Sequence, residues 1–166
     1  MAQPSEASQD IIEVAEHERT AYIRIRGRAT FMLANDFRDY VKGQIETGRG
    51  VLIDLSECTT LDSTFVGMIT SLTLKYREQD GSCIKLFNIS SHVREILQTL
   101  GLLDILDTVR SDRDNGLAFA AISHELHTKI NIAKLMLDAH KALARINDDN
   151  ALEFKNVINY LEKQVK

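Results

Sequence analysis

Residues 51–79 constrain the fold of this 166-residue chain more than any other stretch. They begin with a nearly continuous apolar run, which is typical of a strand that is covered on both faces. A polar and turn-prone segment, residues 56–60, follows as a predicted loop. Apolar residues then recur at spacings of three and four, and this pattern predicts a helix with a broad buried face. The stretch therefore predicts a buried strand, a short loop and a helix.

Three residues that favour helix N-caps stand between this strand and this helix, namely Asp62, Ser63 and Thr64. Whichever of them caps the helix, a side-chain oxygen is presented where free backbone N–H groups and the helix dipole favour negative charge. From the residues alone, Ser63 is either a plain N-cap or a candidate functional hydroxyl. The start of this helix is the main candidate site in the chain.

The segment LIDLSECTTLDSTFVG resembles the signature of STAS domains, the fold of bacterial anti-sigma factor antagonists. The resemblance covers roughly residues 11–109. It implies that Ser63 matches the family's phosphorylatable serine, with Thr64 as a second candidate, and that Asp62 matches the acidic residue before it. It also implies a partner surface made of Asp62, Ser63, Thr64 and Phe65. The expected partner is an anti-sigma factor or a serine kinase-like protein. ATP would belong to that partner, so we expect no cofactor in this chain.

Strands alternate with helices along residues 10–110, and this order predicts an α/β fold with a mixed β-sheet and crossover helices. Residues 11–14 and 21–26 are predicted to pair as a hairpin, and residues 103–109 suit a last edge strand. We expect a flexible start over residues 1–9, the STAS domain over 10–110 and a C-terminal helical extension over 111–166. The polar segment SDRDN, residues 111–115, marks the boundary between domain and extension.

The extension carries two amphipathic patterns, over residues 126–146 and 151–165, which predict an antiparallel helical hairpin. Residues 117–122 suit either a strand or the start of a helix. The two apolar stripes exceed what so short a hairpin can hide, so the open face of the sheet or the tail of a second copy should cover the remainder. We therefore expect a homodimer or an added docking surface. The positions expected to be buried are Leu137, Val157, Ile158 and Leu161.

The composition is that of an ordinary soluble protein, with 44% hydrophobic and 27% charged residues. A net charge of −4 favours neither nucleic acid nor an anionic membrane as partner. We see no apolar run long enough for a membrane span and no hydrophobic signal core at the N-terminus. Two widely spaced cysteines suit buried free thiols in a reducing compartment. These features together predict a cytoplasmic protein.

Metal binding and catalysis are alternatives that the sequence favours less. His124, Glu125 and His127 form H-E-x-H, not the H-E-x-x-H of zinc proteases, so we expect solvated surface histidines and no metal site. Asp54 and Asp62 could form an acid–base or magnesium pair, but we expect Asp54 to satisfy loop backbone at the end of its strand. The sequence contains no G-x-G-x-x-G, Walker or G-x-S-x-G motif. We therefore predict a non-enzyme.

Three hypotheses follow for the function. The first is a regulatory binding protein whose unphosphorylated form binds an anti-sigma factor or kinase-like partner and which phosphorylation of Ser63 switches off. The alternative is a structural STAS module of a stable signalling or lipid-transport assembly, in which Ser63 is only a helix cap. The third, a small nucleotide-binding or hydrolytic α/β protein, lacks a phosphate-binding loop in the sequence.

Overall fold

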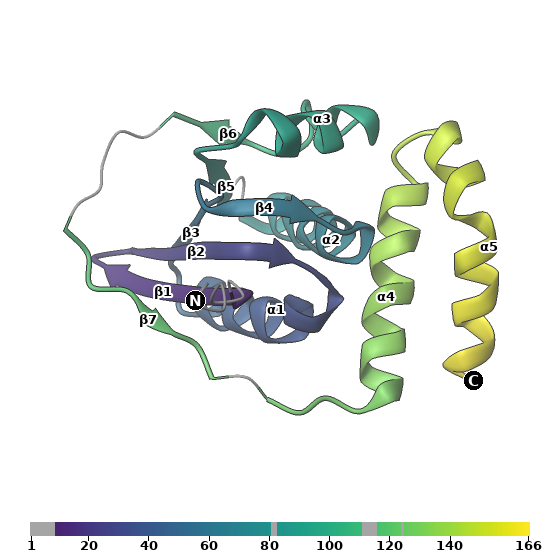
Figure 1. The fold of residues 1–166 in the computed structure, drawn as a ribbon, viewed down its shortest axis with the longest axis horizontal. Coiled ribbons are helices and arrows are strands. Elements are labelled where there is room, and N and C mark those ends of the chain that lie inside the picture. The colour runs from purple at the N-terminus through teal and green to yellow at the C-terminus, as the bar shows by residue number, and fades with distance from the viewer. Residues whose placement is uncertain (1–8, 81–82, 111–115, 124) are drawn as a thin grey trace, which may run out of the picture.

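A computed structural model describes residues 9–80, 83–110, 116–123 and 125–166 (Figure 1). The predicted flexible start, apart from Gln9, the boundary segment 111–115 and His124 lie outside the described residues. None of the helices that the structure describes has the length and apolar character that a membrane crossing needs. The elements in chain order are β1 (Ile11–His17), β2 (Thr20–Ala29), α1 (Phe31–Glu46), β3 (Gly50–Asp54), β4 (Cys58–Leu61), α2 (Ser63–Asp80), β5 (Ile84–Phe87), α3 (Ser91–Thr99), β6 (Thr108–Val109), β7 (Ala120–Ala121), α4 (Lys129–Ala144) and α5 (Asp148–Gln164).

The sheet is mixed and has the order β6-β5-β3-β2-β1-β7. β1 and β2 form the predicted antiparallel hairpin, and the chain turns between them at Glu18, which has φ 51°. β2, β3, β5 and β6 run parallel, and α1, α2 and α3 are the crossovers that such pairing needs. The predicted α/β fold with a mixed sheet, crossover helices and C-terminal helices is confirmed.

Two local predictions are wrong. Residues 56–60 are not simply a loop, because β4 forms there and pairs in parallel with the second half of β2, while β3 pairs with the first half. Cys58 and Leu61 are both buried on this short strand. The edge strand predicted over residues 103–109 shrinks to β6, since Leu102 and Leu106 enter the core from turns before it.

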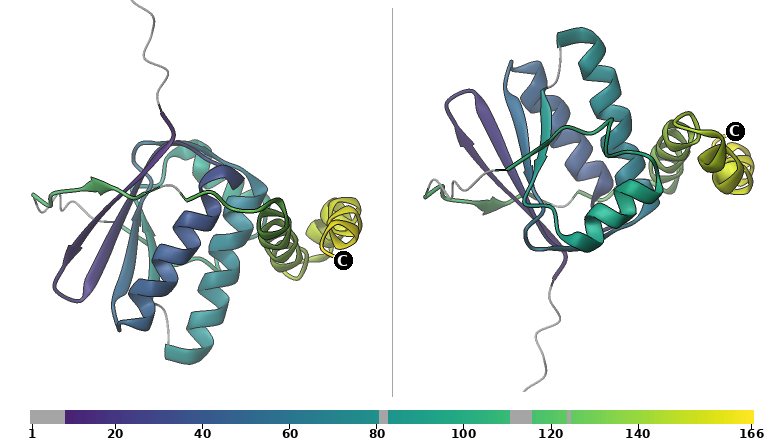
Figure 2. Two further views of the ribbon diagram at one scale, coloured as in Figure 1. Left: turned by 90° about the horizontal axis from the view of Figure 1, so that it is seen from below. Right: turned by 90° about the horizontal axis from the view of Figure 1, so that it is seen from above.

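The hydrophobic core lies between the sheet and the helices α1 and α2, which share one face of the sheet (Figure 2). β2 and β3 contribute fully buried isoleucines and α1 and α2 contribute phenylalanines. Phe37 of α1 and Phe65 of α2 meet edge to face, with ring centroids 4.9 Å apart. The first turn of α2 is therefore fixed from inside the domain.

The helices α4 and α5 form the predicted hairpin, and α4 packs against α2 while α5 lies outermost (Figures 1 and 2). Of the two candidate covers for the hairpin, the open face of the sheet is wrong, because α4 packs against the helix α2, and the tail of a second copy stays a prediction. Leu137 and Leu161 are buried, and Val157 and Ile158 are partly buried against the core. Within residues 117–122, β7 answers the open question in favour of a strand, which pairs with β1.

Candidate functional site

The start of α2 is organised by Asp62, which caps the helix. Its Oδ1 accepts a hydrogen bond of 2.7 Å from the backbone N–H of Phe65, two residues into the helix. Its Oδ2 accepts a second, also of 2.7 Å, from the backbone N–H of Phe31 at the start of α1. One carboxylate thus holds the starts of two helices together. Because Asp62 does the capping, the hydroxyl of Ser63, the first residue of α2, is left outside the cap.

The Ser63 hydroxyl meets a histidine from the C-terminal hairpin. Ser63 Oγ lies 3.0 Å from Nε2 of His140, although the two residues are 77 positions apart. His140 Nδ1 lies 2.7 Å from the carbonyl oxygen of Met136, which can only accept, so Nδ1 carries the proton. In the neutral imidazole Nε2 is then an acceptor, and Ser63 donates to it. The pair is a serine hydroxyl on an imidazole whose orientation α4 fixes.

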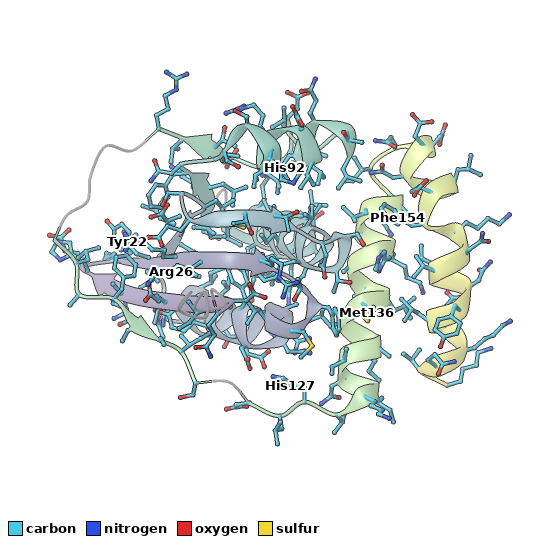
Figure 3. The ribbon with its side chains drawn as sticks, in the orientation of Figure 1. Tyr22, Arg26, His92, His127, Met136 and Phe154 are labelled. Atoms are coloured by element: carbon cyan, nitrogen blue, oxygen red, sulfur yellow. The ribbon has the colours of Figure 1, made fainter. Side chains whose placement is uncertain are left out.

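His140 is buried, with only 4% of its surface exposed. The ring of Phe154 of α5 packs edge to face against it, with centroids 5.3 Å apart. Figure 3 labels Phe154 and Met136, which hold the imidazole from α5 and α4 respectively. His140 falls within the amphipathic pattern of residues 126–146, but that pattern gives no sign of its contact with Ser63. No local pattern could have found a partner that only the packing of α4 on α2 supplies.

The hairpin approaches α2 closely at Gly67, one turn after Ser63. A Cβ atom at Gly67 would lie 2.7 Å from the carbonyl carbon of Ala139, which is an overlap with backbone. Any residue larger than glycine at this position would therefore force α4 away from α2. The helix that carries the candidate site and the helix that covers it touch through their backbones.

The structure places the four residues predicted for the partner surface in two different environments. Asp62 and Ser63 are partly exposed. Thr64 is only 3% exposed, and Phe65 is fully buried against Phe37. Thr64 as a second phosphorylation site, and Thr64 and Phe65 as partner contacts, remain predictions that require a change of conformation.

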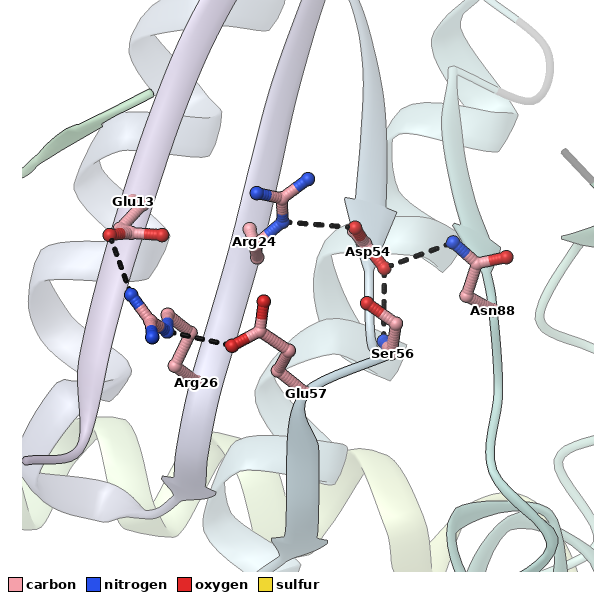
Figure 4. Close-up of polar contacts among 7 residues, drawn as sticks. All are labelled: Glu13, Arg24, Arg26, Asp54, Ser56, Glu57 and Asn88. Carbon is pink, nitrogen blue, oxygen red and sulfur yellow. Dashed lines mark hydrogen bonds and ion pairs between the residues drawn. The ribbon is translucent and has the colours of Figure 1, made fainter. Parts of the chain in front are cut away.

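Asp54 at the end of β3 serves the local backbone, as predicted, and also joins a polar network (Figure 4). Its Oδ1 accepts from the backbone N–H of Ser56 at 2.9 Å and from the side chain of Asn88 at 3.2 Å. Its Oδ2 lies 3.1 Å from Nε of Arg24. Burial acts to raise the pKa of Asp54, but these hydrogen bonds outweigh it, so the pKa lies below its ordinary value. The other carboxylate of the suggested acid–base pair, Asp62, binds different partners.

A second polar cluster on the sheet surrounds Arg26 of β2. Its guanidinium lies 2.7 Å from Glu57 and 3.3 Å from Glu13 of β1 (Figure 4). These pairs tie β1, β2 and the segment before β4 together on the surface of the sheet.

The expectation of a solvated surface histidine is wrong for His127. Its Nε2 lies 2.8 Å from Oδ1 of Asp36 on α1, and both side chains are largely buried. The backbone N–H of Glu125 donates to the same oxygen at 3.3 Å. Among the residues that the structure describes, no group of three or more His, Cys, Asp or Glu side chains is arranged to hold a metal ion. His127 instead fixes the segment before α4 to α1.

These observations describe an α/β domain with a serine at the head of its second helix, and comparison with known proteins names the class. The model of the STAS domain family matches residues 12–116, more than half of the chain. The protein belongs to the STAS domain family. The helices α4 and α5 lie outside the matched region.

Two relatives match in sequence. The anti-sigma-B factor antagonist of Bacillus subtilis is 27% identical over 96 residues, which are 58% of this chain and 87% of that protein. A STAS-domain containing protein of Pseudomonas aeruginosa is 37% identical over 75 residues, 45% of this chain and 73% of the relative.

Solved structures share the fold, among them those of two anti-sigma factor antagonists. The anti-sigma factor antagonist SpoIIAA in its unphosphorylated form gives a TM-score of 0.55 at 18% identity, covering 63% of this chain and 91% of SpoIIAA. An anti-sigma factor antagonist from Mycobacterium paratuberculosis gives 0.52 at 14% identity, covering 68% and 94%. At these identities the likeness concerns the fold.

Proposed function

We propose that this protein is a regulatory binding protein of the anti-sigma factor antagonist type. In its unphosphorylated form it binds an anti-sigma factor or a kinase-like partner through the start of α2, and phosphorylation of Ser63 ends the contact. The observation that carries the proposal is that Asp62, and not Ser63, caps α2. Ser63 can therefore accept a phosphoryl group without the loss of the helix cap.

The physics of the helix start favours such a switch. A phosphate would add nearly two negative charges and three acceptor oxygens to Ser63. The N-terminal end of the α2 dipole would stabilise that charge, so the domain need not unfold to carry it. The same charge would oppose a partner surface that fits the neutral hydroxyl. The chain supplies the hydroxyl and the shape, while ATP and the catalytic groups belong to the partner.

The relatives support the proposal in two ways. The Bacillus subtilis relative is by name an anti-sigma-B factor antagonist. SpoIIAA has been solved in both an unphosphorylated and a phosphorylated form, so the same fold accommodates both states in that protein. By the same reasoning we place the protein in a bacterial cytoplasm and in the regulation of transcription.

Incubation of the purified chain with ATP, magnesium and extract of its source organism tests the proposal. We expect mass spectrometry to find phosphate at Ser63, and we expect a Ser63→Ala variant to stay unmodified. An immobilised unphosphorylated chain should then retain a kinase-like or anti-sigma protein that the phosphorylated chain releases. Equal retention by both forms would refute the switch.

The Ser63–His140 hydrogen bond favours a second candidate, a structural STAS module of a stable signalling or lipid-transport assembly. In that case the hydroxyl serves only to hold the hairpin on α2. The expected result is a stable stoichiometric complex with no phosphate at Ser63. The hydroxyl–imidazole pair also has the geometry of a nucleophile and its base, so turnover assays of the purified chain belong beside these experiments.

A further inference from the structure

We infer that the α4–α5 hairpin is a built-in competitor for the partner surface, which masks Ser63 until the hairpin leaves α2. This inference rests on the proposed function, since it names the regulation of the same site. The STAS family match ends at residue 116, so the hairpin is an addition to the domain that carries Ser63. It packs directly against the helix that Ser63 begins.

The mask acts on the acceptor atom itself. Ser63 Oγ donates to His140 Nε2 at 3.0 Å, and the imidazole is buried between α2 and α5. A phosphoryl group on Oγ needs far more room than the hydroxyl hydrogen that now lies between Ser63 Oγ and His140 Nε2. Phosphorylation and the docked hairpin therefore exclude one another.

The mask is held by three further contacts. Leu143 of α4 is fully buried in the core, and the backbone of Ala139 touches Gly67. In the first turn of α5, the side-chain amide of Asn150 donates to the carbonyl of Leu100 at 2.9 Å, beside the end of α3. These contacts involve α4 and the start of α5, and none of them holds the sheet together. The hairpin can therefore leave as a unit while the sheet and α1 to α3 stay paired.

Access to position 63 can be measured without any partner. We would introduce Ser63→Cys and follow alkylation by N-ethylmaleimide, with peptide mass spectrometry to separate this thiol from Cys58 and Cys83. The rate in guanidinium gives the value for a fully accessible thiol. Leu143→Asp in the same chain places a charge beneath the hairpin, whereas Leu152→Asp places one on its outer side, where Leu152 is 76% exposed. These two variants make the same chemical change on the same hairpin.

We expect slow alkylation in the Ser63→Cys chain and in its Leu152→Asp control. We expect Leu143→Asp to raise the rate about tenfold or more, because opening of the cover controls access to a masked group. If Leu143→Asp reduces the helical content of the domain by circular dichroism, Gly67→Ala decides, since its Cβ pushes α4 away and alanine favours helix. Two results would overturn the mask. One is alkylation of the folded Ser63→Cys chain as fast as in guanidinium, and the other is an alkylation rate that neither Leu143→Asp nor Gly67→Ala changes.

The second readout is phosphorylation of the native Ser63 by ATP and cell extract. Leu143→Asp should be phosphorylated about tenfold faster than Leu152→Asp if the docked hairpin limits access. Equal rates after a positive alkylation result would overturn the competition. Phosphate in neither variant would overturn the proposed function and with it the regulatory role, while the alkylation result would still stand for the physical mask.

Discussion

Two adjacent residues at the start of α2 have different roles. Asp62 satisfies backbone donors of α1 and α2, and Ser63 extends its hydroxyl toward the hairpin. A substitution at Asp62 should therefore change stability, and one at Ser63 should change what the surface recognises.

Asp62→Ala removes the acceptors of two helix starts at once. We expect the free energy of unfolding to fall by about 2 kcal/mol, the sum of a lost N-cap and a second lost hydrogen bond. Asp62→Asn keeps one side-chain carbonyl and should fall between Asp62→Ala and wild type. Urea denaturation followed by circular dichroism measures the order. Equal stability of Asp62→Ala and wild type would contradict the role of Asp62 as the shared cap.

Ser63→Asp should abolish partner binding, because it places a charge in the contact surface, and it should leave α2 intact because Asp62 remains the cap. Ser63→Ala should bind the partner constitutively. It should also cost roughly 1–2 kcal/mol, since the buried Nε2 of His140 loses its donor. Affinity measurements with the captured partner test both variants. A Ser63→Asp chain that binds as well as wild type would end the phospho-switch hypothesis.

Asp54 predicts how stability depends on pH. Its pKa in the folded protein lies below its ordinary value, so the folded state favours the charged form more than the unfolded chain does. This stabilisation is present above the ordinary pKa of about 4 and is lost as the pH falls through the lower folded value. Asp54→Asn should therefore lose more stability at pH 7 than at pH 3. The measurement is the urea midpoint of wild type and of Asp54→Asn between pH 3 and pH 7. A difference between the two midpoints that does not change with pH would contradict this prediction.

At the scale of elements, β2 switches partners along its length, and Gly27 stands at the switch. Its φ of +80° suits glycine, and a Cβ there would lie 2.6 Å from a carboxylate oxygen of Asp10. Gly27→Ala should therefore cost about 2 kcal/mol. Gly43→Ala is the matched control, because its Cβ meets nothing within 4 Å inside α1 and alanine is the better helix former. In thermal unfolding, Gly27→Ala should have a lower midpoint temperature than wild type, and Gly43→Ala should not. Equal midpoints for Gly27→Ala and wild type would show that Gly27 is not needed where β2 changes partners.

The elements also show where sequence patterns suffice. The strand and helix of residues 51–79, and the start of the site at Asp62 and Ser63, follow from local periodicity and capping preferences. β4 was missed because the register shifts beside Gly27, so its buried residues, Cys58 and Leu61, are three positions apart and do not alternate. The pairs Ser63–His140 and Asp36–His127 join segments 77 and 91 residues apart, and only tertiary packing brings them together.

At the scale of the whole molecule, the hairpin makes the C-terminus part of the site. Leu137 and Leu161, which sequence patterns assigned to an interface, are buried within a single chain. This burial accounts for part of the apolar surface that had suggested a dimer. Apart from Leu152, the large apolar side chains that stay exposed on the described part of the hairpin lie around the N-terminal end of α4 and the C-terminal part of α5.

That remaining surface supports the last prediction, a homodimer through the N-terminal end of α4 and the C-terminal part of α5. Ile130 and Tyr160 stay exposed and line a hollow of about 400 Å³ between α4 and α5, with Leu126, 97% exposed, just before α4. Exposed apolar groups of this kind usually mark an interface, and two-fold self-pairing is the commonest way to cover one. Sedimentation equilibrium should show a dimer at high micromolar concentration. Ile130→Asp should dissociate it, whereas Leu152→Asp, near the start of α5, should not, and a wild-type monomer at that concentration would rule the dimer out.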